Sequence, residues 1–178
     1  MKNNNGFARA RRHGLRTLAA IALISFSSTA LAALDMLLVI PGVTGESTDA
    51  TFPGAINVLA WSWGDVRPSA PPALSCFQQD LSLTKYVDTA TPPLLLGLVR
   101  GRIYPRIKLV IRSLAGAAPQ DYITFEMINA QLTSLSTGGS GGEDRLTENI
   151  SIHFLRPIYT YTPLTGGAPV IANVPACP

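Results

Sequence analysis

The feature that most constrains the fold of this chain is a period-two alternation of apolar and polar residues. In the stretch RIKLVIRS, Ile107, Leu109 and Ile111 fall on one face of an extended backbone. Lys108 and Arg112 fall on the opposite face. Because successive side chains of a β-strand point to opposite sides, this spacing predicts a strand with one buried and one solvated face.

Comparable runs predict strands along most of the remaining chain. They are apolar or alternating, and they cover residues 34–40, 56–63, 80–86, 122–127, 146–154 and 158–162. After residue 127 the apolar positions shift to Ile128, Ala130 and Leu132. This shift predicts a β-bulge near Met127 or Ile128.

One segment, DTATPPLLLGLVRG, departs from the alternation. It has capping residues and prolines at its start, leucines at helical spacing and Gly101 at its end, which together predict a helix near residues 91–100. A sheet with one apolar side must close on itself or pack against a helix. We therefore predict a mainly β protein, built as a small barrel with one short flanking helix.

Much of the positive charge lies at the beginning of the chain. Five of the 14 basic residues are Lys2, Arg9, Arg11, Arg12 and Arg16, and no acidic residue accompanies them. Without this segment nine basic residues stand against 11 acidic ones, a net charge of −2. A basic surface for nucleic acid or anionic lipid is therefore not expected.

The basic segment is followed by an apolar run, LAAIALISFSSTALA, that ends in an Ala-Leu-Ala site. This order is typical of a secretory signal peptide. The run holds about 14 residues, fewer than the ~20 that a membrane-spanning helix needs. We expect residues 1–32 to be a signal peptide cleaved between Ala32 and Ala33, by either the general or the twin-arginine route. The protein is then secreted or periplasmic.

The chain after the signal divides into residues 33–163, which hold the predicted barrel, and a Pro/Gly-rich tail at residues 164–178. Residues 65–76 are rich in proline and are expected to form a loop. Cys76 and Cys177 are the two cysteines of the chain, and an even number in an exported protein permits a disulfide. We predict that they pair; two free thiols are the alternative.

The glycine-rich stretch TGGSGGEDRLTEN begins at Thr137. A Walker-type phosphate loop needs a lysine after its glycines and a helix behind it. This stretch has no lysine and leads into an alternating strand, so its glycines suit a flexible connection between two strands. We expect subunit or ring contacts from a set of neighbouring loop residues: Gly138, Gly139, Ser140, Gly141, Gly142, Glu143, Asp144 and Arg145.

Glu143, Asp144 and Glu148 are close enough in sequence to suggest paired carboxylates for acid–base chemistry. Arg145 lies between them, however, and no apolar environment surrounds the group. We expect a solvated charged loop or a subunit contact.

His153 is the one histidine after the signal segment, on the polar face of its strand. A Ser-His-Asp hydrolase would have to use it, with Ser140 as the candidate nucleophile. Gly139, Ser140 and Gly141 match only part of the sequence pattern of a nucleophile elbow, so a small hydrolase is the weakest hypothesis. A lone histidine and no CxxC pair argue against a metal site. We assign no catalytic, metal-binding or cofactor-binding residue and expect no cofactor.

Trp61 and Trp63 share one face of the strand predicted at residues 56–63. Paired aromatic rings on a strand serve a hydrophobic core, a contact surface or a platform for sugars. We favour core packing or a subunit contact over a sugar platform.

Four stretches together resemble the Hcp family, the haemolysin-coregulated proteins of type VI secretion. They are LDMLLVIPGVTGES, INVLAWSWG, QDLSLTKYVDTATPPLL and STGGSGGEDRLTENISIHF. These stretches follow the family's order and approximate spacing between about Leu34 and Pro163. The run from Trp61 to Gly64 and the loop from Gly138 to Asn149 are the most specific parts.

The resemblance implies two β-sheets closed into a barrel with a flanking α-helix. It also implies homohexameric rings that stack into a hollow tube, which a contractile sheath expels behind a spike protein. Such rings can carry small effectors, so the expected partners are the chain itself and spike, sheath or effector proteins. The role is structural, and the subunit is not expected to be an enzyme.

The signal peptide sets this chain apart from the family pattern. Family members that build the tube assemble in the cytoplasm and need no such segment. A second hypothesis is therefore an exported Hcp-like ring, filament or binding module that works in the periplasm or outside the cell. No membrane span is expected after signal cleavage.

Overall fold

The computed structural model describes residues 34–69, 76–115, 118–142 and 144–176. These residues form nine strands and one helix. In chain order the elements are β1 (Leu34–Val39), β2 (Ile56–Ser62), β3 (Asp65–Val66), β4 (Phe77–Gln78), β5 (Leu81–Tyr86), α1 (Thr91–Val99), β6 (Ile103–Ser113), β7 (Gln120–Gly138), β8 (Thr147–Tyr161) and β9 (Val170–Asn173). The predicted signal segment, residues 1–32, lies outside the described residues.

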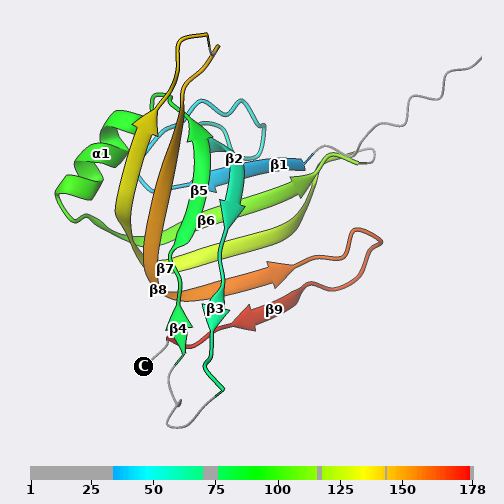
Figure 1. The fold of residues 1–178 in the computed structure, drawn as a ribbon. Helices are drawn as coiled ribbons and strands as arrows, with labels where there is room; N and C mark the ends of the chain where they lie inside the picture. Colours follow the sequence, from blue (N-terminus) through cyan, green and yellow to red (C-terminus); the bar gives the residue numbers. More distant parts are fainter. Residues whose placement is uncertain (1–33, 70–75, 116–117, 143, 177–178) are drawn as a thin grey trace, which may run out of the picture.

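Six antiparallel strands close into a barrel. Their hydrogen-bonded order is β5-β2-β1-β6-β7-β8, and β5 pairs with β8 to complete the circle. The long strands β7 and β8 bend, so that each contributes to both layers of the barrel, and α1 lies beside them (Figure 1). This arrangement confirms the predicted mainly β fold of two sheets with one flanking helix.

The apolar face of β6 lies in the core as predicted, but the face predicted to be solvated is not, because Val110, Arg112 and Ser113 are buried as well. Ile107, Leu109 and Ile111 are buried in the core, and Leu109 lies opposite Phe125 of β7. The core also takes apolar side chains from β1, β2, β5, β8 and α1. Because one face of each strand supplies this core, a single closed barrel buries all of the alternating faces together.

The bulge predicted near Met127 or Ile128 is wrong, because the pairing register runs unbroken through both residues. The slip in alternation marks a corner of the sheet instead. Three adjacent strands each place two outward residues between two buried ones: β6 between Tyr104 and Ile107, β7 between Met127 and Ala130, and β8 between Phe154 and Pro157.

Asn129 in β7 takes up the change of direction at this corner. Its backbone φ is +51°, a left-handed conformation that asparagine tolerates better than most residues. The bulges of β7 lie elsewhere, where its register shifts near Tyr122 and Thr133. The break in alternation that predicted a bulge in one strand is therefore explained by a corner that runs across three strands.

Helix α1 follows its sequence signals closely. Pro92 and Pro93 occupy its first positions, and Gly101 ends it with a φ of +61°. The Gly101 amide donates to the Leu98 carbonyl at 3.0 Å, and the Arg102 amide donates to the Gly97 carbonyl at 2.9 Å. This pair of bonds is the Schellman arrangement, which satisfies the last carbonyls of a helix.

Three segments contain more β-strand than the sequence predicted. The strands expected at residues 146–154 and 158–162 form one strand, β8, which continues through Pro157. The predicted loop at residues 65–76 contains β3, which pairs with β4. The predicted tail contains β9, which pairs with β8 from Ile158 to Tyr161.

Candidate functional site

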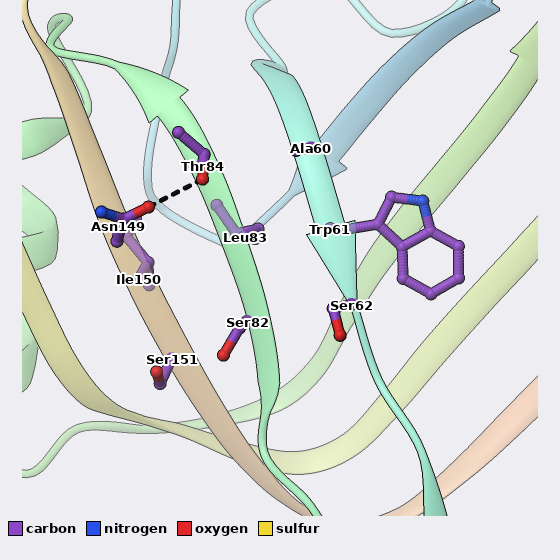
Figure 2. A pocket seen from close by; sticks show the side chains of 9 residues that line it. All are labelled: Ala60, Trp61, Ser62, Ser82, Leu83, Thr84, Asn149, Ile150 and Ser151. Carbon is purple, nitrogen blue, oxygen red and sulfur yellow. Dashed lines mark hydrogen bonds between the residues drawn. The ribbon is translucent and has the colours of Figure 1, made fainter.

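The outer face of β2, β5 and β8 carries a shallow groove of about 360 Å³. Small polar side chains line it: Ser62 from β2, Ser82 and Thr84 from β5, and Asn149 and Ser151 from β8 (Figure 2). The Thr84 hydroxyl donates to the Asn149 side-chain oxygen at 2.7 Å. These residues were not predicted as site residues, although their alternation with the buried leucines of β5 places them on one outer face.

Trp61 also borders this groove, but its ring, like that of Trp63, packs against the core. The ring of Trp63 lies 4.7 Å from that of Phe125, and the ring of Trp61 lies 6.4 Å from it. A shift in register between Val58 and Ala60 lets both tryptophans point inward. Their role as subunit contacts stays a prediction, and core packing is the role that the ring contacts describe.

The glycine-rich loop joins β7 to β8 and projects beyond the end of the barrel (Figure 1). A side chain added at Gly138, Gly141 or Gly142 would meet no described atom within 4 Å. Gly142 has a φ of +106°, which few other residues adopt. The loop is thus open to a neighbouring molecule, although its predicted subunit contacts stay a prediction. Glu143 lies outside the described residues.

Arg145 at the base of this loop is held in place from two sides. Its guanidinium carbon lies 4.4 Å from the Tyr86 ring centroid, and its Nη2 lies 3.6 Å from Glu46 Oε2. Arg145 is half exposed, so these contacts orient it without burying its charge. Asp144 beside it is exposed.

Glu148 corrects the expectation of a solvated acidic loop. It belongs to β8, and its side chain is fully buried against Lys85 of β5, with 2.7 Å between Lys85 Nζ and Glu148 Oε1. Thr91, at the start of α1, also donates to Glu148 Oε1 at 2.9 Å.

Lys85 is the centre of this buried cluster and was not among the predicted site residues. Its ammonium donates to Glu148, to Asp88 at 2.7 Å, to the Tyr86 carbonyl at 2.7 Å and to Thr91 at 3.3 Å. Lys85 follows Leu81 and Leu83 at a spacing of two, which placed it on the buried face. A lysine in that register was the available signal for an internal ion pair.

His153 lies on the outer face, as predicted, and pairs with an acid. Its Nδ1 lies 3.0 Å from Asp80 Oδ1, and the Thr133 hydroxyl donates to Asp80 Oδ2 at 2.6 Å. Ser140 is not brought to this cluster. It lies beyond the β7–β8 hairpin end at Thr147, and six residues of strand from Thr147 to His153 span about 20 Å.

Two further expectations concern cysteines and metals. Cys76 is not a free thiol in the structure, but Cys177 lies outside the described residues, so their pairing stays a prediction. Among the residues with described positions, no group of three or more His, Cys, Asp or Glu side chains is placed to hold a metal ion.

Comparison with known proteins shows to which family this barrel belongs. The sequence model of a family described as "Type VI secretion system effector, Hcp" matches residues 37–161, which run from β1 to the end of β8. The chain belongs to the Hcp family. It is 42% identical to Protein hcp1 of Pseudomonas aeruginosa over 137 residues, covering 74% of this chain and 85% of that protein.

Solved structures of the Hcp family have the same fold. Hcp1 from Salmonella typhimurium superimposes with a TM-score of 0.68 at 27% identity, over 79% of this chain and 92% of that one. A type VI secretion system effector from Yersinia pestis also gives a TM-score of 0.68 at 27% identity, over 80% of this chain and all of that one. The resemblance inferred from the four sequence stretches is confirmed, and this Hcp chain is a type VI secretion protein.

Proposed function

We propose that this Hcp chain is a ring-forming subunit of a type VI secretion tube. The observation that carries the proposal is the family match over residues 37–161, which spans the closed barrel from within β1 to the end of β8. In this proposal the chain forms homohexamers, the rings stack, and the tube works with sheath and spike proteins and carries effectors. A structural role also fits a surface on which Ser140 and His153 lie far apart.

The groove and the projecting loop support an assembly role in different ways. The groove offers small polar side chains on a broad sheet face, and the loop offers glycine backbone with open space around it. Both are surfaces that a neighbouring subunit could approach closely, because small polar side chains predominate in the groove and glycines predominate in the loop. We assign the loop residues from Gly138 to Arg145 to subunit or ring contacts.

The location of the working protein separates the two remaining hypotheses. None of the described helices is long and apolar enough to cross a membrane. If residues 1–32 direct export, the chain reaches the periplasm without a sheath. If it works in the tube, its release from the cell depends on sheath contraction.

Cell fractionation tests this proposal. We expect the protein in the medium of cells with a working sheath and its retention in cells whose sheath cannot contract. A matched variant without residues 1–32 controls for the signal segment. Release that needs residues 1–32 but does not depend on sheath contraction would overturn the tube proposal. It would favour an exported Hcp-like ring or binding module.

A further inference from the structure

Helix α1 is apolar on the side that faces away from the barrel. Leu94 and Gly97 are buried against the barrel, but Leu95 is 47%, Leu96 is 53% and Val99 is 78% exposed. Ile103, just after the helix, is 63% exposed. A helix that is apolar on all sides is normally covered on all sides. The exposed ridge of Leu95, Leu96 and Val99 therefore points to a binding surface.

Two arginines flank this apolar ridge. Arg100 and Arg102 are both exposed, and within the described part of the chain neither forms an ion pair. Arg102 lies over the Tyr104 ring, 4.9 Å from its centroid, and the first turn of α1 holds no acidic residue. The ridge thus has an apolar centre and an uncompensated positive border.

A groove with the complementary character lies on the other side of the barrel. It measures about 420 Å³ between β1 and β2, and Leu34, Met36 and Leu59 contribute apolar surface to it. Leu34 is 47% and Leu59 is 39% exposed. Asp35 also lines this groove, and its carboxylate makes no hydrogen bond or ion pair with the residues that the structure describes.

Arg145 also lines the β1–β2 groove, but its charge already has a partner. It is paired with Glu46 and stacked on Tyr86, as described above. Asp35 is therefore the charge in the groove that is free to meet an incoming cation. An apolar ridge bordered by arginines and an apolar groove bordered by an aspartate belong to the same chain.

We propose that α1 of one copy docks into the β1–β2 groove of the next copy, with Arg100 and Arg102 facing Asp35. Figure 1 shows α1 on one side of the barrel and β1 and β2 on the opposite side, beyond β7, β8 and β5. Different surfaces on opposite sides produce a head-to-tail contact, which closes into a ring when the rotation between copies allows it. This inference rests on the proposed ring and names the surfaces that form it.

Charge reversal tests the docking. The test measures native mass against concentration for the exported, purified protein and three variants: Arg100→Glu with Arg102→Glu, Asp35→Arg, and all three changes together. We expect the first two variants to need at least about tenfold more protein for half-assembly, since like charges then face each other. The combined variant restores the opposite charges and should assemble within about threefold of the parent.

Two further variants control for effects on folding and on total charge. Asp35 lies across the strand pair from Arg112, so Asp35→Asn weakens the contact without adding a positive charge beside it. Arg156→Glu reverses an exposed arginine of β8 outside both surfaces and should leave assembly unchanged.

The possible failures separate the inference from the proposed function. Rings that form with unchanged concentration dependence in the reversed variants would overturn the docking of α1 and leave the ring intact. Loss of assembly with no recovery in the combined variant would overturn the pairing of Arg100 and Arg102 with Asp35. A parent protein that stays monomeric at every concentration would overturn both the docking and the ring.

Discussion

Lys85 places a positive charge inside the barrel, where four oxygen atoms lie 2.7–3.3 Å from its ammonium and share its three N–H donors. Its side chain and that of Glu148 are both fully buried. Removing one partner of a buried ion pair leaves a charge with no compensation, whereas replacing both by apolar residues costs much less. The cluster also fixes the start of α1 through Thr91, so it joins β5, β8 and the helix.

We expect Lys85→Met to lower the free energy of unfolding by about 3–5 kcal/mol, because Glu148 then remains buried and unpaired. Adding Glu148→Leu should recover most of that loss. Urea unfolding of the parent, the single variant and the double variant measures both effects. A loss below about 1 kcal/mol for Lys85→Met would contradict the internal role of the pair.

Gly97 lies on the side of α1 that is buried against the barrel. A Cβ atom built there would lie 2.5 Å from the Tyr104 hydroxyl, which is buried and has no hydrogen-bond partner among the described residues. Alanine favours a helix over glycine by about 1 kcal/mol, but this contact is too short to tolerate. Steric contact therefore outweighs helix propensity at this position.

Gly97→Ala should destabilise the protein by about 1–3 kcal/mol, although the same change stabilises an exposed helix. Tyr104→Phe removes the clashing oxygen and should be nearly neutral alone, since that oxygen makes no hydrogen bond. The double variant should regain much of the stability. A thermal unfolding cycle measures this coupling, and equal losses with and without Tyr104→Phe would refute the contact.

At the scale of elements, the segment between β1 and β2 is tied to the sheet through Asp49. Its Oδ1 accepts hydrogen bonds from the amides of Thr51 and Phe52, each at 2.8 Å, and its Oδ2 lies 2.7 Å from Arg112 Nη1. The Phe52 amide is the largest cause that holds the pKa of Asp49 below its usual 3.8, and Thr51 and Arg112 act in the same direction against the opposing effect of burial.

Because the folded-state pKa of Asp49 is lowered, its contribution to stability is complete above pH 3.8 and is lost as the pH falls through the lowered pKa. Asp49→Asn should therefore destabilise the protein at neutral pH, and the difference from the parent should shrink below pH 3.8. Urea unfolding across this pH range provides the measurement. A difference that stays constant below pH 3.8 would contradict this role of Asp49.

The predicted link between loop and tail belongs to this scale too. In sequence, β4 follows Cys76 directly, and β9 ends a few residues before Cys177. We predict that thiol titration of the denatured, unreduced exported protein finds no free cysteine. Two titratable thiols in protein recovered from the periplasm would refute the pairing.

The sequence predicted most elements, and the exceptions have physical reasons. Prolines, leucines and Gly101 located α1 because backbone restrictions act locally. β3, β4 and β9 were missed because they are short, and because no residue of β3 or β9 is buried, so they carry no apolar alternation. The sheet corner was missed because its cause is shared by three strands, and one strand's pattern cannot reveal that.

For the whole molecule, the candidate site was only partly predictable. The glycine-rich loop was placed correctly between two strands, since its composition excludes regular structure. Glu148 was misassigned because its partner, Lys85, lies 63 residues away in sequence. The surfaces that would meet between subunits depend on which exposed residues gather in three dimensions, and this cannot be obtained from alternation within single strands.

The central claim is that this Hcp chain closes into a ring of six, and the native mass of the exported, purified protein tests it most directly. At micromolar concentration and moderate salt, we predict a dominant species with six times the mass of the mature subunit. A head-to-tail contact supports this result because, once the ring closes, both contact surfaces of every subunit are occupied by a neighbour. A single species with the mass of one subunit, unchanged with increasing concentration, would contradict the claim.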